Sequence, residues 1–339
     1  MKIKIDKNNF ETLIRGASIF TTGGGIMIPD QMKTLKGLDL SVEIYSLDEF
    51  DEKSFLCTVG ELGPTDAPPL KKDKIIKKML KLIEQKTGKN IVGLFPPEIG
   101  QESVVLESSQ LLKLPIADFD PTGFRAVPYF DVNIFNVKNI DFQLTPIVVA
   151  NDNGDISVIE GNIRYKEVEN KLREMSTRSE SGIIFLMGMT ISIKKLLENG
   201  ITGPSYSRAL EIGLIKTQTK LFKKLKAKKI IRGKVIDKIT VEKKGFLAEK
   251  IKIKDDSWNL YTLIMLNEAI FLLDETGKII ASVPERILLL DGEKAQGLSG
   301  VFLNINTPVT IAIIDPSKEW RNKNSKNIFG KKRFEELLK

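Results

Sequence analysis

The spacing of apolar residues divides the chain into a first half of alternating helices and strands and a second half dominated by strands. Apolar residues recur at intervals of three and four in segments that predict amphipathic helices, at 7–20, 75–88 and 102–113. Short apolar runs between them predict strands, at 42–47, 55–59, 90–95 and 114–118. Such alternation predicts an α/β fold with a layered N-terminal domain.

From about residue 229 the pattern changes to short strands separated by turns. Strand-like segments follow one another at 230–241, 246–253, 260–266, 270–273, 279–283, 287–290 and 309–314. This pattern predicts a β-rich C-terminal domain, built as a barrel or a sandwich. Between the halves we expect a strand at 183–189, a short helix at 192–198 and one long helix from Gly203-Pro204 to about Lys226.

These elements predict four regions along the chain. An α/β domain that carries the site spans 1–165, and a helical connector that packs on it spans 166–228. The β-rich domain spans 229–317, and a C-terminal tail spans 318–339.

Composition excludes several kinds of chemistry. The 339 residues contain no histidine, which excludes Ser-His-Asp and Cys-His sites and His-ligated metals. No cofactor is predicted, although a divalent cation held by oxygen ligands stays open. The single cysteine, Cys57, lies in an apolar run and lacks a histidine to activate it, so we expect a small core residue.

The net charge of +8 comes mostly from lysine. Nucleic-acid readers favour arginine forks and stacking aromatics, so we expect a solvated lysine-rich surface and no nucleic-acid partner. No apolar run approaches the length that spans a bilayer, and the N-terminus lacks a signal-peptide core. We therefore expect no membrane partner and a cytoplasmic location.

Three loops in the first half carry the candidate chemistry. They are Thr21-Thr22-Gly23-Gly24-Gly25, the segment from Glu98 through Gly100 to Glu102, and the segment containing Asp118, Asp120, Gly123 and Arg125. Each follows a segment expected in the core. Because such loop ends gather in one crevice of an α/β domain, we expect a shared small-molecule site, catalytic in nature.

Each loop admits two interpretations. The glycine triplet either forms a nest of N–H groups for an anion or makes a tight turn after a helix. Glu98 and Glu102 either contact a ligand or cap a helix, whose field would favour their ionised forms. Asp118 and Asp120 either serve the site or are ionised structural groups beside Arg125, which can reach back to them. If the strand continues, we expect the two aspartates to point to opposite faces. A fourth segment, 151–155, is rich in oxygen ligands, and a hairpin turn is the favoured interpretation.

In this order the motifs resemble the S-methyl thiohydantoin desulfurase family, whose members often lie beside hydantoinase or oxoprolinase proteins. The matching segments are Thr22–Gly25, Glu98-Ile99-Gly100, Asp118 with Asp120, Gly123–Pro128, Ala150–Asp155, Gly203–Gly213 and Asn327–Gly330. Four positions depart from the family pattern: Ile26 and Gln101 replace glycines, Tyr129 replaces an acidic residue, and Asp155 replaces an asparagine.

The resemblance implies hydrolysis of a five-membered cyclic urea or thiourea ring. Asp118 or Asp120 would activate water, Arg125 would grip the substrate, and Glu98 would bond a ring N–H. Substrate would contact Thr21, Thr22, Gly23, Gly24, Gly25, Gly100 and Gly123. The alternative is a non-catalytic subunit or ligand-binding partner of a hydantoinase-like enzyme, and association of identical chains stays open.

Overall fold

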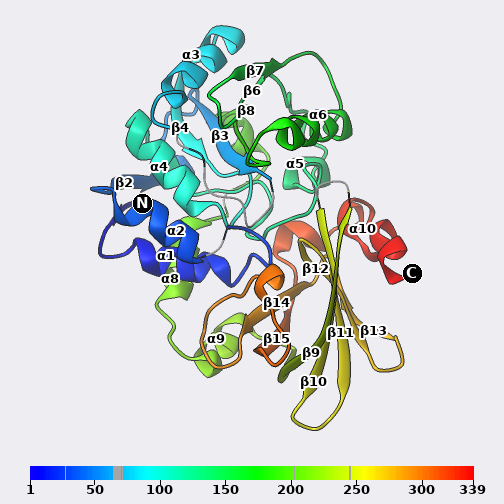
Figure 1. Ribbon diagram of the computed structural model, residues 1–339. Helices are drawn as coiled ribbons and strands as arrows, with labels where there is room; N and C mark the ends of the chain where they lie inside the picture. The colour runs from blue at the N-terminus through cyan, green and yellow to red at the C-terminus, as the bar shows by residue number, and fades with distance from the viewer. Residues whose placement is uncertain (27, 64–69, 71, 202, 244–245) are drawn as a thin grey trace.

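The computed structural model describes residues 1–339 apart from 27, 64–69, 71, 202 and 244–245, and it contains two sheets (Figure 1). The first is a mixed sheet of eight strands, in the order β1-β2-β5-β4-β3-β8-β6-β7. The neighbours from β2 to β3 are parallel, and the other pairs are antiparallel. Its strands are β1 (Lys2–Asp6), β2 (Ser41–Tyr45), β3 (Phe55–Leu62), β4 (Ile91–Phe95), β5 (Ile116–Ala117), β6 (Ile147–Ala150), β7 (Ile156–Ile159) and β8 (Ile184–Ser192).

Helices cover both faces of this sheet. One face packs against α1 (Phe10–Ser18), α2 (Ile28–Lys36), α3 (Ile76–Thr87), α4 (Glu102–Leu112), α8 (Tyr206–Gly213) and α9 (Gln218–Leu225). The other packs against α5 (Ile134–Val137), α6 (Tyr165–Arg178) and α7 (Ile193–Glu198). Both faces of the central strands are therefore buried, which explains their apolar composition.

The second sheet is antiparallel and curls into a half-barrel below the first (Figure 1). Its order is β13-β12-β11-β10-β9-β15-β14. The strands are β9 (Lys229–Lys243), β10 (Phe246–Asp255), β11 (Leu260–Leu266), β12 (Glu268–Asp274), β13 (Ile279–Ser282), β14 (Arg286–Asp291) and β15 (Pro308–Ile314). The predicted two-domain α/β architecture with a β-rich second domain is thus confirmed.

The C-terminal segment folds back onto this half-barrel. It contains the short helices η3 (Lys318–Arg321), α10 (Lys323–Phe329) and η4 (Lys331–Leu338). Trp320, Phe329 and Phe334 are buried in a cluster with β12 and with residues near the candidate site. Two further 3-10 turns, η1 (Leu47–Glu49) and η2 (Gly300–Phe302), connect strands.

The prediction of one long helix from residue 203 to 226 is wrong. The chain forms α8 and α9 with a turn between them. Gly213 ends α8 in close contact with α1, and a Cβ there would lie 1.9 Å from the Thr12 carbonyl oxygen. The reciprocal contact puts a Cβ on Gly16 of α1 at 1.8 Å from the Ala209 carbonyl oxygen. The glycines therefore serve close helix packing, which periodicity alone does not reveal.

Two smaller predictions are confirmed. Cys57 is fully buried in β3. Residues 151–155 form the turn of the β6–β7 hairpin. No helix in the described ranges is both long and apolar enough to cross a membrane.

Candidate functional site

The glycine loop lies between the two sheets and is hydrogen-bonded to both domains. The Ile26 N–H donates to the Gly100 carbonyl at 3.0 Å, which joins the loop to the turn before α4. On the other side, the Ala269 N–H donates to Thr22 at 2.8 Å and the Gly300 N–H donates to Gly23 at 3.0 Å. The second domain is thereby held directly against the glycine loop, which is itself bonded to the second predicted loop.

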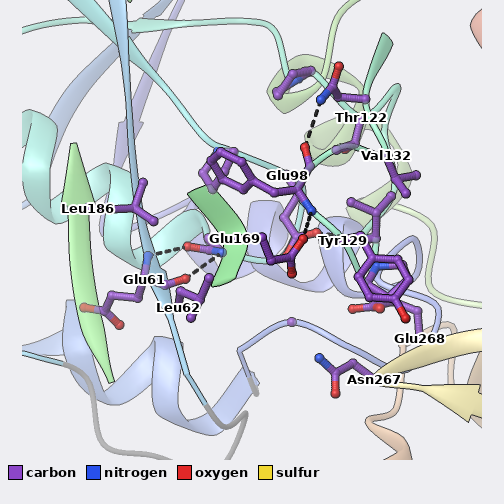
Figure 2. A pocket seen from close by; sticks show the side chains of 18 of the residues that line it. Glu61, Leu62, Glu98, Thr122, Tyr129, Val132, Glu169, Leu186, Asn267 and Glu268 are labelled. Carbon is purple, nitrogen blue, oxygen red and sulfur yellow. Dashed lines mark hydrogen bonds between the residues drawn. The ribbon is translucent and has the colours of Figure 1, made fainter. Parts of the chain in front are cut away.

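A cavity of about 140 Å³ opens beside these loops (Figure 2). Each of the three predicted loops contributes to its wall, through Gly25, Glu98 and Thr122. The remaining wall comes from β3, the segment 127–135, α6, β8 and β12. Its other polar lining residues are Glu61, Gln101, Tyr129, Asn133, Glu169, Arg173, Asn267 and Glu268. The segments far apart in sequence therefore do meet at one cavity.

Glu98 is positioned by the turn that follows β4. Its carboxylate accepts the Val127 N–H at 2.8 Å and also interacts with the Gln101 side chain. Burial raises the pKa of Glu98 to about 8, with smaller contributions from the charges of Asp120 and Glu102. At that pKa the carboxyl exchanges a proton near neutral pH, as a general acid or base requires.

Glu102 begins α4 and accepts the Gly100 N–H at 2.9 Å. Burial raises the pKa of Glu102 to about 7. The expectation that the helix field would keep Glu98 and Glu102 ionised is therefore wrong. Both carboxyls are fully desolvated, and desolvation outweighs a helix dipole that acts most strongly at exposed positions.

Glu268 is a site residue that the sequence interpretation missed. It begins β12, faces the cavity from the second domain (Figure 2), and is 3% exposed. Its Oε2 atom has no hydrogen-bond partner among the described residues. Burial and the neighbouring Glu98 raise the pKa of Glu268 well above its usual value. The sequence did hold one sign of this role, because Glu268 is a charged residue inside the apolar stretch 260–273.

The glycine triplet makes room for this carboxyl. A Cβ on Gly24 would lie 2.3 Å from Glu268 Oε1, so any larger residue displaces the carboxyl group. Gly25 packs against Gly100, where a Cβ would lie 3.2 Å from the Gly100 Cα. The glycines thus allow close packing against Glu268 of the second domain and against Gly100 of the first. Neither of the two interpretations, an anion nest or a tight turn, includes this packing role.

An ion pair forms another wall of the cavity. Glu169 of α6 accepts the Phe130 N–H at 2.9 Å and pairs with Arg173 at 2.7 Å. The Arg173 guanidinium stacks 3.5 Å from the centre of the Phe246 ring, in β10. This pair therefore fixes the position of α6 against the second domain.

Asp118 and Asp120 lie outside the lining of this cavity. The Asp118 Oδ1 accepts the N–H groups of Ser205, Tyr206 and Ser207, at 2.8, 2.7 and 3.1 Å. Asp120 accepts the Ser205 hydroxyl at 2.5 Å, together with the hydroxyl and N–H of Thr122. Both aspartates thus hold the start of α8, and activation of water does not fit their placement.

The expectation that these aspartates face opposite sides is wrong as well. Strand β5 ends at Ala117, and the Phe119 N–H bonds back to the Ala117 carbonyl at 2.7 Å. Residues two apart on an extended strand share a face, and both aspartates contact Ser205. Burial raises the pKa of Asp120, while its hydrogen bonds to Ser205 and Thr122 oppose the rise.

Arg125 also lies outside the cavity lining and does not reach back to the aspartates. It is 1% exposed, donates to the Pro284 carbonyl at 2.8 Å, and stacks 4.4 Å from the Phe329 ring centre. Burial lowers the pKa of Arg125 to about 9, and the charge of Glu268 opposes that effect. The other predicted substrate contacts also lie outside the lining of this cavity: Thr21, Thr22, Gly23, Gly24, Gly100 and Gly123.

Comparison with known proteins identifies the family. Residues 8–161 match the family model described as S-Me-THD-like, N-terminal domain, and residues 163–337 match S-Me-THD-like, C-terminal domain. The chain belongs to the S-Me-THD-like family. The predicted family is therefore confirmed. In this S-Me-THD-like chain, β8 and α8 of the C-terminal family domain complete the first sheet and one of its covering layers.

A solved structure resembles this S-Me-THD-like fold along its whole length. It is an X-ray crystal structure of a protein from Chromobacterium violaceum, at a TM-score of 0.73 and 17% identity. The alignment covers 98% of this chain and 97% of that one. At this identity the likeness shows a common fold. No curated protein matches the chain.

Three of the departures from the S-Me-THD-like pattern line the cavity: Ile26, Gln101 and Tyr129. Gln101 exchanges two hydrogen bonds with the Glu61 backbone, at 2.8 and 3.1 Å. Tyr129 stacks on Phe334 of the C-terminal segment at 5.8 Å between ring centres. Within the described part of the chain, no group of three or more Asp, Glu or Cys side chains is placed to hold a metal ion.

Proposed function

We propose that the chain is a hydrolase-like enzyme that acts on a hydantoin- or thiohydantoin-type ring at the cavity between its domains. The observation that carries the proposal is the pair of buried carboxyls, Glu98 and Glu268, which face one cavity with raised pKa values. Carboxyl groups with shifted pKa values that face a cleft are typical of acid–base catalytic sites. Membership of the S-Me-THD-like family supports the class of ring.

The hydrogen bonds of the two carboxyls give them different roles. Glu98 accepts the Val127 N–H, which stabilises its ionised form, whereas Glu268 Oε2 has no such donor among the described residues. Glu98 therefore ionises first and acts as the base, and Glu268 keeps its proton and acts as the acid. The hydrogen bond from the Val127 N–H fixes the position of Glu98, and close packing against Gly24 fixes that of Glu268.

The reaction follows from these roles. Water attacks the ring carbon that bears the S-methyl group, and its proton passes to Glu98. Glu268 protonates the ring nitrogen of the adjacent C=N bond, which gives a neutral tetrahedral adduct. The C–S bond then breaks as the adduct hydroxyl passes its proton to Glu268 and becomes a carbonyl, and methanethiol leaves with the proton held by Glu98. One water is consumed, the ring gains a carbonyl oxygen and an N–H in place of the S-methyl group, and both carboxyls return to their starting forms.

The size and walls of the cavity suit such a ring. Its volume is about 140 Å³, and an apolar protein cavity of about 150 Å³ binds benzene. Apolar walls come from Phe130, Leu186 and Met189. A five-membered ring with a small substituent therefore fits with its polar edge toward the carboxyls.

The first test is release of a thiol. The purified chain is incubated with an S-methyl thiohydantoin, and methanethiol is measured with a thiol reagent. We expect kcat/KM to rise as the pH approaches 8, because Glu98 ionises, and to fall at higher pH, because Glu268 loses its proton. Absence of turnover by the isolated chain, with a hydantoinase-type protein co-purifying in stoichiometric amount, would instead support the non-catalytic subunit.

A Gly24→Ala substitution tests the position of Glu268. The new Cβ would push the Glu268 carboxyl from its place at the cavity, so we expect kcat/KM to fall by at least about tenfold. The free energy of unfolding should fall by only about 1–2 kcal/mol, because the clash is with the end of a side chain. Gly37→Ala is the matched control, since a Cβ there meets nothing within 4 Å. Full activity of Gly24→Ala would remove Glu268 from the mechanism.

A further inference from the structure

A second cavity lies on the other side of the Asp118–Arg125 loop. Its volume is about 350 Å³, and no described residue lines both it and the first cavity. Its walls come from that loop, from α8 of the first layered domain, from β14 of the half-barrel and from the segment 316–321. The cavity therefore lies where both domains and the C-terminal segment meet.

A buried arginine in this wall has an unused donor. Arg286 of β14 is 5% exposed, and its Nε and Nη2 atoms donate to the Asp315 carbonyl at 3.2 and 3.1 Å. Its Nη1 atom has no partner in the part of the chain that the structure describes. A buried cationic donor without an acceptor is costly, and an anion bound in the cavity would supply the missing acceptor.

A second arginine stands beside it. The Arg208 guanidinium lies 4.8 Å from the ring centre of Phe124 and 5.6 Å from that of Phe20, and the Arg286 guanidinium lies 5.4 Å from the same Phe20 ring. Burial lowers the pKa of Arg208, and the charges of Asp120, Glu319 and Glu211 oppose that effect, although none of these carboxylates forms a hydrogen bond or ion pair with Arg208 among the described residues. Burial lowers the pKa of Arg286 to about 9, with smaller contributions from the charges of Arg208 and Arg125.

The carboxylates in the wall do not balance this charge. The lining carries the cations Arg208, Arg286, Arg321 and Lys318 against Asp120 and Glu319. The oxygens of Asp120 already accept hydrogen bonds from Ser205, Thr122 and Phe124, so they are not free for the arginines. Ser317, which also lines the cavity, has a buried hydroxyl without a partner among the described residues.

We propose that this second cavity binds a small, multiply charged oxyanion group, a phosphate or a dicarboxylate, between Arg208 and Arg286. Guanidinium groups bind such oxygens in pairs of parallel hydrogen bonds. Arg286 Nη1 and the Ser317 hydroxyl supply donors from the half-barrel side, and Arg208 supplies donors from α8. The ligand thus links the two domains at a place separate from the first cavity.

Thermal unfolding with and without anion tests the proposal. Saturating inorganic phosphate should raise the Tm of the wild-type chain by roughly 3–5 °C at constant ionic strength, and titration calorimetry should show one saturable site. Arg208→Gln should lose most of this shift and weaken the affinity at least about tenfold. Arg178→Gln, which removes an exposed charge on α6, should keep both the Tm shift and the affinity of the wild type.

The same measurement with succinate in place of phosphate distinguishes a dicarboxylate ligand from a phosphate ligand. The anion that gives the larger Arg208-dependent rise in Tm identifies the chemical group that the cavity binds. If Arg208→Gln fails to fold, Arg321→Gln, at the exposed rim, should give a partial loss. The proposal is overturned if neither anion raises the Tm, or if the shift is equal in the wild type and the folded variants. General salt stabilisation would produce the second result, because it does not depend on one arginine.

Discussion

Replacement of Glu98 by Gln should lower the rate of thiol release by about 10²–10⁴-fold, the usual contribution of a general base. The amide cannot take the proton of the attacking water, yet it keeps an oxygen that can accept the Val127 N–H. The fold should therefore survive. Turnover measured across pH should also lose its rise toward pH 8. Glu275→Gln, in an exposed turn, is the matched control and should behave as the wild type.

The same substitution should change how stability depends on pH. The folded pKa of Glu98 is about 8, above the unfolded value of about 4.3, so the folded chain holds more protons between these pH values. The free energy of unfolding of the wild type should thus fall as the pH rises through this window, and Glu102 should add to the fall. Glu98→Gln should match the wild type near pH 5 and exceed its stability near pH 9. If the wild type and Glu98→Gln had equal urea midpoints of unfolding at pH 5 and again at pH 9, burial would not raise the Glu98 pKa.

Removal of the Asp118 carboxylate should destabilise the chain more than any change at the cavity wall. Asp118→Ala leaves three N–H groups at the start of α8 without an acceptor, two of them buried, together with the Ser207 hydroxyl. We expect a loss of about 3–5 kcal/mol in the free energy of unfolding, from the lost cap and the unpaired donors. Asp39→Ala, at an exposed position, should be nearly neutral.

Activity measurements separate this structural role from a catalytic one. At a temperature where Asp118→Ala remains folded, kcat should stay within a few-fold of the wild type, because Asp118 lies outside the cavity lining. Asp118→Asn, which keeps one oxygen to accept the backbone N–H groups, should recover part of the stability. A loss of kcat as large as that of Glu98→Gln, in a folded variant, would return Asp118 to the catalytic site.

The sequence indicated the location of the site more reliably than the roles of its residues. All three predicted loops reach the cavity. The loops after β4 and β5 meet because neighbouring parallel strands end at the same edge of the sheet, and the glycine loop joins them through the Ile26–Gly100 hydrogen bond. Whether a carboxylate is free depends on what packs against it. Asp118 is occupied by residues 205–207, which lie almost ninety positions further along the chain. Glu98, which looked like a helix-capping group, is instead enclosed by the segment 127–133 and by β12.

The sequence by itself determined the local elements, the family and the glycine and carboxylate loops, because each of these depends on residues close together along the chain. The tertiary structure decided which carboxyls face the cavity, that Glu268 joins Glu98 from the other domain, and that Arg208 and Arg286 come together. It also decided protonation, because the energy of a charge depends on the solvent that packing removes. That packing is made by segments whose contact no local pattern encodes.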